Sequence, residues 1–190
     1  MDKKYRWTVD TESDFGGRSL TTQGLDDGLP RILNLFKVHK IKALFFVSTE
    51  LLFRCRERIW LIKEYGHEIG AHGHFHVIYN NQDRAREDMR LSVDFLKLAN
   101  LIKEPVHFRY PKFNTQDSTE PYSCRRNHVS LLRLLFKADK LSPDSTIYLH
   151  PFDVTEWKSI PPNLFCKLWY SQPKRAWNLL ERLCHENMSN

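Results

Sequence analysis

The sequence predicts an α/β fold built on a parallel sheet or barrel. Short apolar runs typical of buried strands alternate along the chain with segments whose apolar residues recur at helical spacing. Polar residues directly follow several of these runs, as they do where loops gather at the carboxyl edge of a parallel sheet. Because 190 residues can bury a real core and no linker or repeat interrupts them, we expect one domain, residues 1–190.

Five strand candidates divide the chain. The first is rich in β-forming residues, and the second, ALFFV, is a continuous apolar run typical of a strand covered on both faces. Pro111 and Pro151 end the last two, because proline cannot donate to a strand ladder. The candidates are residues 5–10, 43–47, 67–71, 106–110 and 146–150.

Helical periodicity fills most of the intervals between these strands. Pro30 lies early in the first helix, where a first turn tolerates proline. Ser48 can cap the second helix, which extends with a break to a carboxyl-terminal cap at Gly66. The stretch 112–127 shows no clear period, and the stretch 153–170 is broken by prolines. The expected helices cover residues 25–39, 48–65, 83–103, 129–138 and 173–186.

Composition places the chain among globular proteins and argues against nucleic acid as its partner. Hydrophobic residues form 41% of the sequence and aromatic residues 13%, values that exclude a disordered chain. The net charge is +6, but 29 basic residues are interleaved with 23 acidic ones, which favours a solvated surface over a nucleic-acid-binding face. The four cysteines have neither zinc-knuckle nor disulfide spacing. With no visible signal peptide or membrane-spanning stretch, we expect a cytoplasmic protein.

Four polar residues lie at, or just past, the carboxyl ends of four expected strands. They are Asp10, His72, Arg109 and His150. Each residue alone has a structural explanation. Asp10 could form a turn, and His72 could be an interior histidine with its hydrogen bonds satisfied. Arg109 could be an ion-pair partner, and His150 could cap a loop. Together they indicate one site, because the loops at that edge converge around a single mouth. The histidines at 72, 74 and 76 add the commonest protein ligand for divalent transition metals.

Five stretches, taken together and in order, resemble the polysaccharide deacetylase family, also called the NodB-homology domain or family-4 carbohydrate esterases. They are WTVDTE (7–12), KALFFV (42–47), GHEIGAHGHFH (66–76), FRYP (108–111) and YLHP (148–151). The resemblance implies a distorted (β/α) barrel, shortened here, that holds one divalent metal, most often zinc. It also implies hydrolysis of the amide C–N bond of an N-acetylated sugar or polysaccharide, the expected partner of the site.

The resemblance assigns roles to individual residues. Asp10 matches the base that takes a proton from metal-bound water, Arg109 the arginine that orients this base, and His150 the histidine that protonates the leaving amine. The backbone N–H of Lys112 matches a donor to the oxyanion, and Tyr110 belongs with it to the expected substrate-binding residues. The chemistry is consistent, because amide hydrolysis needs a nucleophile, carbonyl polarisation and a proton for nitrogen.

The metal ligands follow the family pattern only in part. His72 and His76 match the two metal histidines, and His74 between them is expected to support them or to point outward. Most members have two adjacent aspartates at the end of the first strand, but here Thr11 follows Asp10. Since residues i and i+2 of a strand face the same side, Glu12 is the expected third ligand. Two alternatives stay open: Asp14 reaching in from the loop, or Glu12 and Asp14 forming a solvated pair that balances Arg18.

A second departure affects the end of the chain. The interval between Pro111 and His150 is short, and it lacks the acidic-tryptophan motif that in the family tunes the last histidine. The barrel is therefore expected to lack a strand–helix unit, with its site open on one side. Two alternatives follow: a catalytically impaired domain that binds glycans through aromatic residues such as Trp157, Trp169 and Tyr170, or hydrolysis of a non-sugar amide. The sequence indicates no oligomeric state.

Overall fold

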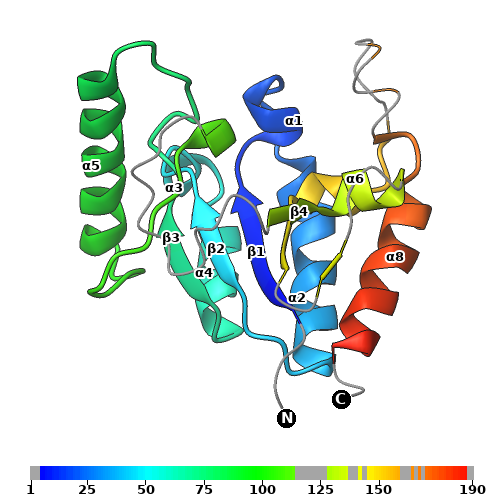
Figure 1. Cartoon of the computed structure of the whole chain (residues 1–190). Coiled ribbons are helices and arrows are strands. Elements are labelled where there is room, and N and C mark those ends of the chain that lie inside the picture. Colours follow the sequence, from blue (N-terminus) through cyan, green and yellow to red (C-terminus); the bar gives the residue numbers. More distant parts are fainter. Residues whose placement is uncertain are drawn as a thin grey trace.

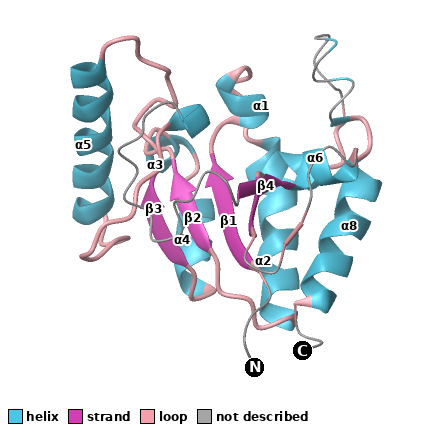
Figure 2. Ribbon diagram, in the orientation of Figure 1, coloured by secondary structure: helices cyan, strands magenta, loops and turns pink. Residues whose placement is uncertain are grey.

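A five-stranded parallel sheet forms the centre of the protein (Figures 1 and 2). The computed structural model describes residues 5–113, 128–136, 141–142, 145–158, 164, 167 and 170–187. The strand order is β3-β2-β1-β5-β4, and every pairing is parallel. The strands are β1 (Arg6–Thr11), β2 (Leu44–Val47), β3 (Glu68–Ala71), β4 (His128–Ser130) and β5 (Thr146–Leu149). In this described part the edge strands β3 and β4 do not pair, so the sheet is open, as in a distorted barrel.

Helices connect the strands and cover the sheet, as a parallel arrangement requires. The longer ones are α2 (Leu29–Val38), α4 (Arg56–Glu64), α5 (Gln82–Leu98) and α8 (Pro173–Glu186). Shorter elements are α1 (Asp14–Gly17), η1 (Gly24–Gly28), α3 (Leu51–Arg54), η2 (Pro111–Phe113), α6 (Leu131–Leu135) and η4 (Pro151–Val154). The first and last long helices are in contact, with the Arg31 guanidinium 4.3 Å from the centre of the Trp177 ring. Among the described helices, none combines the length and apolar character that a membrane span requires.

The core lies between the sheet and these helices. All four residues of β2 are buried, which confirms that this strand is covered on both faces. On β1, Trp7 packs edge-on against Phe36 of α2, with the ring centres 5.4 Å apart. Because Val9 and Leu149 are paired neighbours in the sheet and both are fully buried, β1 and β5 are held as rigid central strands.

Several expected elements are confirmed. The terminal helix spans the predicted residues, and the predicted break in the second helix falls at Cys55, between α3 and α4. Gly66 has a φ of +72°, the left-handed conformation that a helix C-cap favours. Ser48, however, does not cap α3: its hydroxyl lies 3.4 Å from the carbonyl of His72, and Glu50 occupies the cap position.

Three expected elements differ from the structure. Residues 106–110 form a single bridge between Phe108 and Ala71 instead of a strand, because prolines at 105 and 111 limit the extended segment between them. The helix expected over 83–103 ends at Leu98, two residues before Asn100, which has a φ of +54°. Residues 128–130 are strand β4 and not the start of a helix, since pairing with β5 overrides the leucine periodicity.

His67, the residue immediately before β3, is a buried titratable group that should make the free energy of unfolding depend on pH. Its Nδ1 accepts a hydrogen bond from the Ala43 N–H at 3.3 Å, and its ring packs near those of Phe36 and Phe45. Burial, and then the charge of Lys42, lowers the pKa of His67 to about 4. The unfolded chain binds this proton near pH 6.5, so the stabilisation is complete above that pH and is lost as the pH falls towards 4.

We therefore expect His67→Phe to flatten the acid limb of the stability profile. Between pH 7 and pH 4.5 the wild type should lose about 1–2 kcal/mol more unfolding free energy than the variant. Urea denaturation at a series of pH values measures this difference. Parallel profiles for the two proteins would show that His67 does not carry the effect.

Candidate active site

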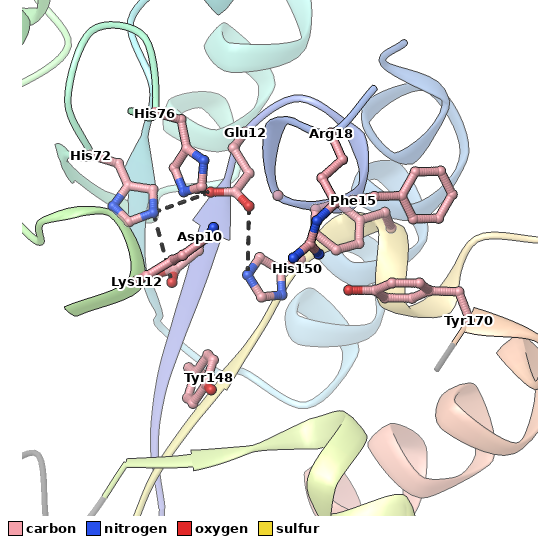
Figure 3. Close-up of a pocket in the computed structure, with 12 residues that line it drawn as sticks. Asp10, Glu12, Phe15, Arg18, His72, His76, Lys112, Tyr148, His150 and Tyr170 are labelled. Carbon is pink, nitrogen blue, oxygen red and sulfur yellow. Dashed lines mark ion pairs between the residues drawn. The ribbon is translucent and has the colours of Figure 1, made fainter. Parts of the chain in front are cut away.

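The carboxyl ends of β1, β3 and β5 surround a cavity of about 390 Å³ (Figure 3). Parallel strands end at the same edge of the sheet, so side chains far apart in the sequence meet there. Residues predicted for the site line this cavity: Asp10, Glu12, His72, His76, Lys112 and His150. The edge of the sheet that the sequence pattern indicated is therefore the edge that carries the cavity.

Three buried residues in this cavity form a set that fits a metal ion. Glu12, His72 and His76 each offer one ligand atom, and these atoms all lie within 4.8 Å of one another. The Nε2 of His72 is 3.2 Å from Oε2 of Glu12, and His76 contacts the same oxygen. Within the described part of the chain, Glu12 Oε2 and His72 Nε2 are buried without a hydrogen-bond partner. Two imidazoles and a carboxylate converging in this way suit a divalent cation such as zinc.

The backbone around the histidines orients their rings. His72 Nδ1 lies 2.7 Å from the carbonyl oxygen of Arg109, a contact that turns Nε2 towards Glu12. His76 has a φ of +51°, which brings its ring back over the same carboxylate. Gly17 lies beside this ring, since a Cβ there would be in ordinary contact with His76 Nδ1 at 3.4 Å, and its φ of +72° favours glycine.

Asp14 and His74 lie outside this set. The Asp14 carboxylate accepts hydrogen bonds from the Thr21 hydroxyl at 2.7 Å and from the N–H groups of Gln23 and Gly24 at 2.8 and 2.9 Å. Asp14 therefore fixes its own loop, and the structure brings Glu12 to the histidines instead. His74 stacks on Phe95 and hydrogen-bonds Thr49, which agrees with its expected position outside the ligand set. The alternative of a solvated acidic pair is wrong, since both carboxylates are buried.

Charged neighbours determine the ionisation of Glu12. Burial alone would raise the pKa of this carboxyl. The charge of His76, together with the close contacts of the His72 and His76 imidazoles, outweighs burial and holds the pKa of Glu12 well below its usual range. Glu12 is consequently an anion at neutral pH, as a metal ligand must be.

Asp10 lies beside this set as an ionised carboxylate. Its Oδ1 accepts a hydrogen bond from the Arg109 guanidinium, and its Oδ2 is 3.9 Å from His72 Nε2. Burial alone would raise the pKa of Asp10, but the charges of Arg109 and His72 lower it overall. A buried carboxylate kept ionised by a fixed guanidinium can serve as a general base.

Arg109 is held by contacts that sequence reasoning missed. The side chain is completely buried, with its guanidinium 4.2 Å from the centre of the Phe46 ring. Its Nη2 lies 3.1 Å from the Thr8 hydroxyl oxygen and 3.1 Å from His128 Nε2. The i, i+2 relation between Thr8 and Asp10 on one strand face was a signal for the first contact. No local signal pointed to His128, because the sequence predicts a helix over 129–138 where the structure has strand β4.

His150 approaches Glu12 from the opposite side of the cavity (Figure 3). Its Nε2 is 3.8 Å from Glu12 Oε1, and its ring stacks on Phe152 at 4.5 Å between centres. Asp153 Oδ2 lies 3.3 Å from His150 Nδ1 and accepts a hydrogen bond from the His150 N–H at 2.8 Å. Burial alone would lower the pKa of His150, but Asp153 raises it, followed by Glu12 and Asp10, to about 9.

Asp153 thus provides an acidic partner for His150 although the acidic-tryptophan motif is missing from the preceding interval. The i, i+3 spacing from His150 across Pro151 resembles a capping box and was the available signal. A carboxylate on Nδ1 keeps the proton there and directs Nε2 into the cavity.

For the amide hydrolysis that the resemblance implies, we expect Asp153→Asn to lower kcat about 10- to 100-fold with little change in KM or metal content, because it weakens the orientation of His150. Steady-state kinetics on acetate release measures this split. Thr155→Val is the matched control, since Thr155 donates a hydrogen bond to the Pro151 carbonyl at 3.0 Å in the same turn without touching His150. Equal losses in both variants would assign Asp153 a purely structural role.

A sequence profile described as "Polysaccharide deacetylase" matches residues 18–124, more than half of the chain and including His72, His76 and Arg109. The chain belongs to the polysaccharide deacetylase family. A peptidoglycan deacetylase of Helicobacter pylori is 39% identical over 49 residues, which are 26% of this chain and 17% of that relative.

Solved structures of this family share the fold. A CE4 family pseudoenzyme from Bacillus anthracis is 18% identical with a TM-score of 0.63, and the match covers 97% of this chain and 62% of that one. A peptidoglycan deacetylase from Bacillus subtilis is 15% identical with a TM-score of 0.60, covering 97% of this chain and 84% of that one. This protein therefore spans less than two thirds of the length of the Bacillus anthracis pseudoenzyme.

Not every residue expected to bind substrate lines this cavity. Lys112 lines the cavity, but Tyr110 is only 6% exposed, packs edge-on against Phe108 and is not part of the described cavity lining. The structure places Tyr110 outside the cavity because neighbouring residues of an extended segment face opposite sides, and Arg109 faces the site. Of the aromatic residues, Trp157 packs on Phe15 at 4.3 Å, Tyr170 lines the cavity, and Trp169 lies outside the described residues.

Proposed function

We propose that this member of the family is a metal-dependent deacetylase that hydrolyses the acetamide of an N-acetylated sugar. The observation that supports this most is the joint presence around one cavity of a buried Glu12–His72–His76 set, an Asp10 paired with Arg109 and a His150 paired with Asp153. Zinc is the metal we propose, because one carboxylate and two imidazoles suit it. The single sheet supports treating residues 1–190 as one domain.

The residues divide the reaction between the two sides of the cavity. A divalent metal bound by Glu12, His72 and His76 would polarise the acetyl carbonyl and lower the pKa of a bound water to about 7. Asp10 accepts the proton of the attacking water, and its ion pair with Arg109 keeps it available as a base.

His150, on the opposite side of the cavity, protonates the leaving amine. As the water oxygen bonds to the acetyl carbon and the C–N bond breaks, His150 donates its Nε2 proton to the amine nitrogen. Lys112 is placed at the cavity edge with a φ of +53°, and its backbone N–H is the proposed donor to the carbonyl oxygen. The products are acetate and a free amino sugar.

Acetate release tests this function. Zinc-loaded protein should release acetate from chito-oligosaccharides or a lipid-linked N-acetyl amino sugar, lose this activity on chelation and regain it when zinc is returned. Absence of metal binding at micromolar concentration would refute the metal-dependent mechanism. Glycan binding without acetate release from a broad panel of N-acyl substrates would support an impaired binding domain instead.

A further inference from the structure

The two histidines of the metal set are oriented in different ways. His72 is fixed through its second ring nitrogen, because Nδ1 lies 2.7 Å from the Arg109 carbonyl oxygen. His76 has no such contact: within the described part of the chain, its Nδ1 is buried without a hydrogen-bond partner. A histidine that binds a metal usually donates its other N–H to an acceptor that fixes the ring. The His76 ring must therefore be held over Glu12 in another way.

The backbone at His76 is strained. Its φ of +51° lies in the left-handed region, which is unfavourable for a residue with a side chain. Such a conformation persists only where the surrounding structure determines it. The Thr49 N–H donates to the Gly73 carbonyl at 3.1 Å, and the Glu50 N–H donates to the carbonyl of residue 74 at 3.0 Å. These two bonds fix the part of the loop that precedes His76.

Asp88 of α5 joins the two sides of this loop. Its Oδ2 accepts a hydrogen bond from the His74 N–H at 2.8 Å, on the amino-terminal side of His76. Its Oδ1 accepts one from the Tyr79 hydroxyl at 3.2 Å, on the carboxyl-terminal side of His76. The carboxylate approaches the backbone so closely that a Cβ at Gly73 would lie 2.8 Å from Oδ2. Only glycine, with a φ of +82° here, leaves room for this contact.

The Asp88 carboxylate has no competing role in the described part of the chain. Asp88 is 9% exposed, pairs there with no arginine or lysine, and does not line the cavity. Burying a carboxylate without a counter-charge costs free energy, which the hydrogen bonds from the loop offset. The same helix makes a second contact with the loop, because Phe95 stacks on the His74 ring at 5.1 Å between centres. Helix α5, at the β3 side of the sheet (Figure 1), therefore supports this loop at more than one point.

We propose that Asp88 is a positioning residue for the metal site, which holds the His76 loop in the conformation that binds zinc. The inference rests on the proposed function, because it assumes that a metal binds in the cavity. Asp88 is not among the converging ligand atoms, so its effect on metal affinity passes through His76. His72 does not depend on Asp88, since its ring is fixed by the Arg109 carbonyl.

Zinc affinity tests the proposal. Asp88→Asn should weaken zinc binding about 10- to 100-fold, the usual cost of losing a group that supports a metal ligand. The amide keeps the size of the side chain but accepts hydrogen bonds only through its oxygen, so one side of the loop is released. Tyr79→Phe removes only the longer of the two hydrogen bonds and should cost about 2- to 10-fold. Competition with a chromophoric chelator measures the affinity, and urea denaturation of the metal-free proteins gives the folded fraction.

Asp94→Asn is the matched control, because it removes the same charge from an exposed position of the same helix. Its zinc affinity should stay within about twofold of wild type, as for surface substitutions in general.

A double-variant cycle separates positioning from a general loss of structure. In a His76→Ala background, Asp88→Asn should change zinc affinity by less than about twofold, because the ligand that it positions is gone. In a His72→Ala background, the loss caused by Asp88→Asn should remain about tenfold or more. Calorimetry measures these weaker affinities.

These affinities decide the inference without an acetate assay. Equal zinc affinity in Asp88→Asn and Asp94→Asn, or the same loss with and without the His76 imidazole, would overturn it. If Asp88→Asn does not fold, Tyr79→Phe takes its place in the cycle and is judged by the same two outcomes. A protein that binds zinc but releases no acetate would refute the proposed function alone, while the expected affinity losses would still support the role of Asp88.

Discussion

Replacing Glu12 by glutamine is expected to weaken zinc binding by roughly 100-fold or more and to abolish acetate release. Loss of a residue that only supports a metal ligand costs about 10- to 100-fold in affinity, so loss of a ligand should cost at least the upper value. The change removes the anion that faces His72 and His76 while it keeps the size of the side chain. Competition with a chromophoric zinc chelator measures the affinity.

Asp14→Asn is the matched control for this variant. It removes one negative charge two residues further on, in a side chain whose hydrogen bonds hold its own loop and which is not part of the converging ligand set. Its zinc affinity should stay within about fivefold of wild type, because no ligand is lost, although the loop is weakened. A larger loss in Asp14→Asn than in Glu12→Gln would reverse the assignment of the third ligand.

The sheet was predictable where burial alone determines the strand. All four residues of Leu44–Val47 are apolar and buried, as expected for a strand that is covered on both faces. The continuous apolar run in the sequence is therefore sufficient to predict this strand. The short strand β4 was not predictable, because His128 and Val129 become a strand only by pairing with β5. For residues 106–110, the strand-like composition hid the fact that the segment makes a single bridge, and the flanking prolines at 105 and 111 were the available signal.

The site residues likewise include some that local spacing predicts and some contacts that it does not. The histidines at 72 and 76 and the carboxylate at 12 follow from local spacing, because a strand face and a short loop bring them together. Contacts between distant segments were not predictable, as with His128 on Arg109 across the sheet. Tyr110 shows the converse: it follows Arg109 directly in the sequence, yet it does not line the cavity.

Asp10→Asn is expected to lower kcat about 1,000-fold while zinc remains bound. Asparagine has the shape of aspartate but cannot accept the proton of the attacking water, and general base catalysis contributes about 10²- to 10⁴-fold. Because Asp10 lies beside the metal set and is not among the three residues whose ligand atoms converge there, zinc content should be retained. Acetate release and zinc content are measured on the same preparation.

The ion pair makes a stability control necessary. Arg109 is completely buried, and loss of its counter-charge should cost about 3–5 kcal/mol of unfolding free energy. Thr8→Val removes a second contact of the same guanidinium, 3.1 Å away, and leaves the carboxylate in place. With rates normalised to the folded fraction, Thr8→Val should stay within about tenfold of wild type, since it perturbs the orientation of the base and not the base itself. Similar rates for Asp10→Asn and Thr8→Val would mean that Asp10 acts by positioning Arg109 and that another group takes the proton.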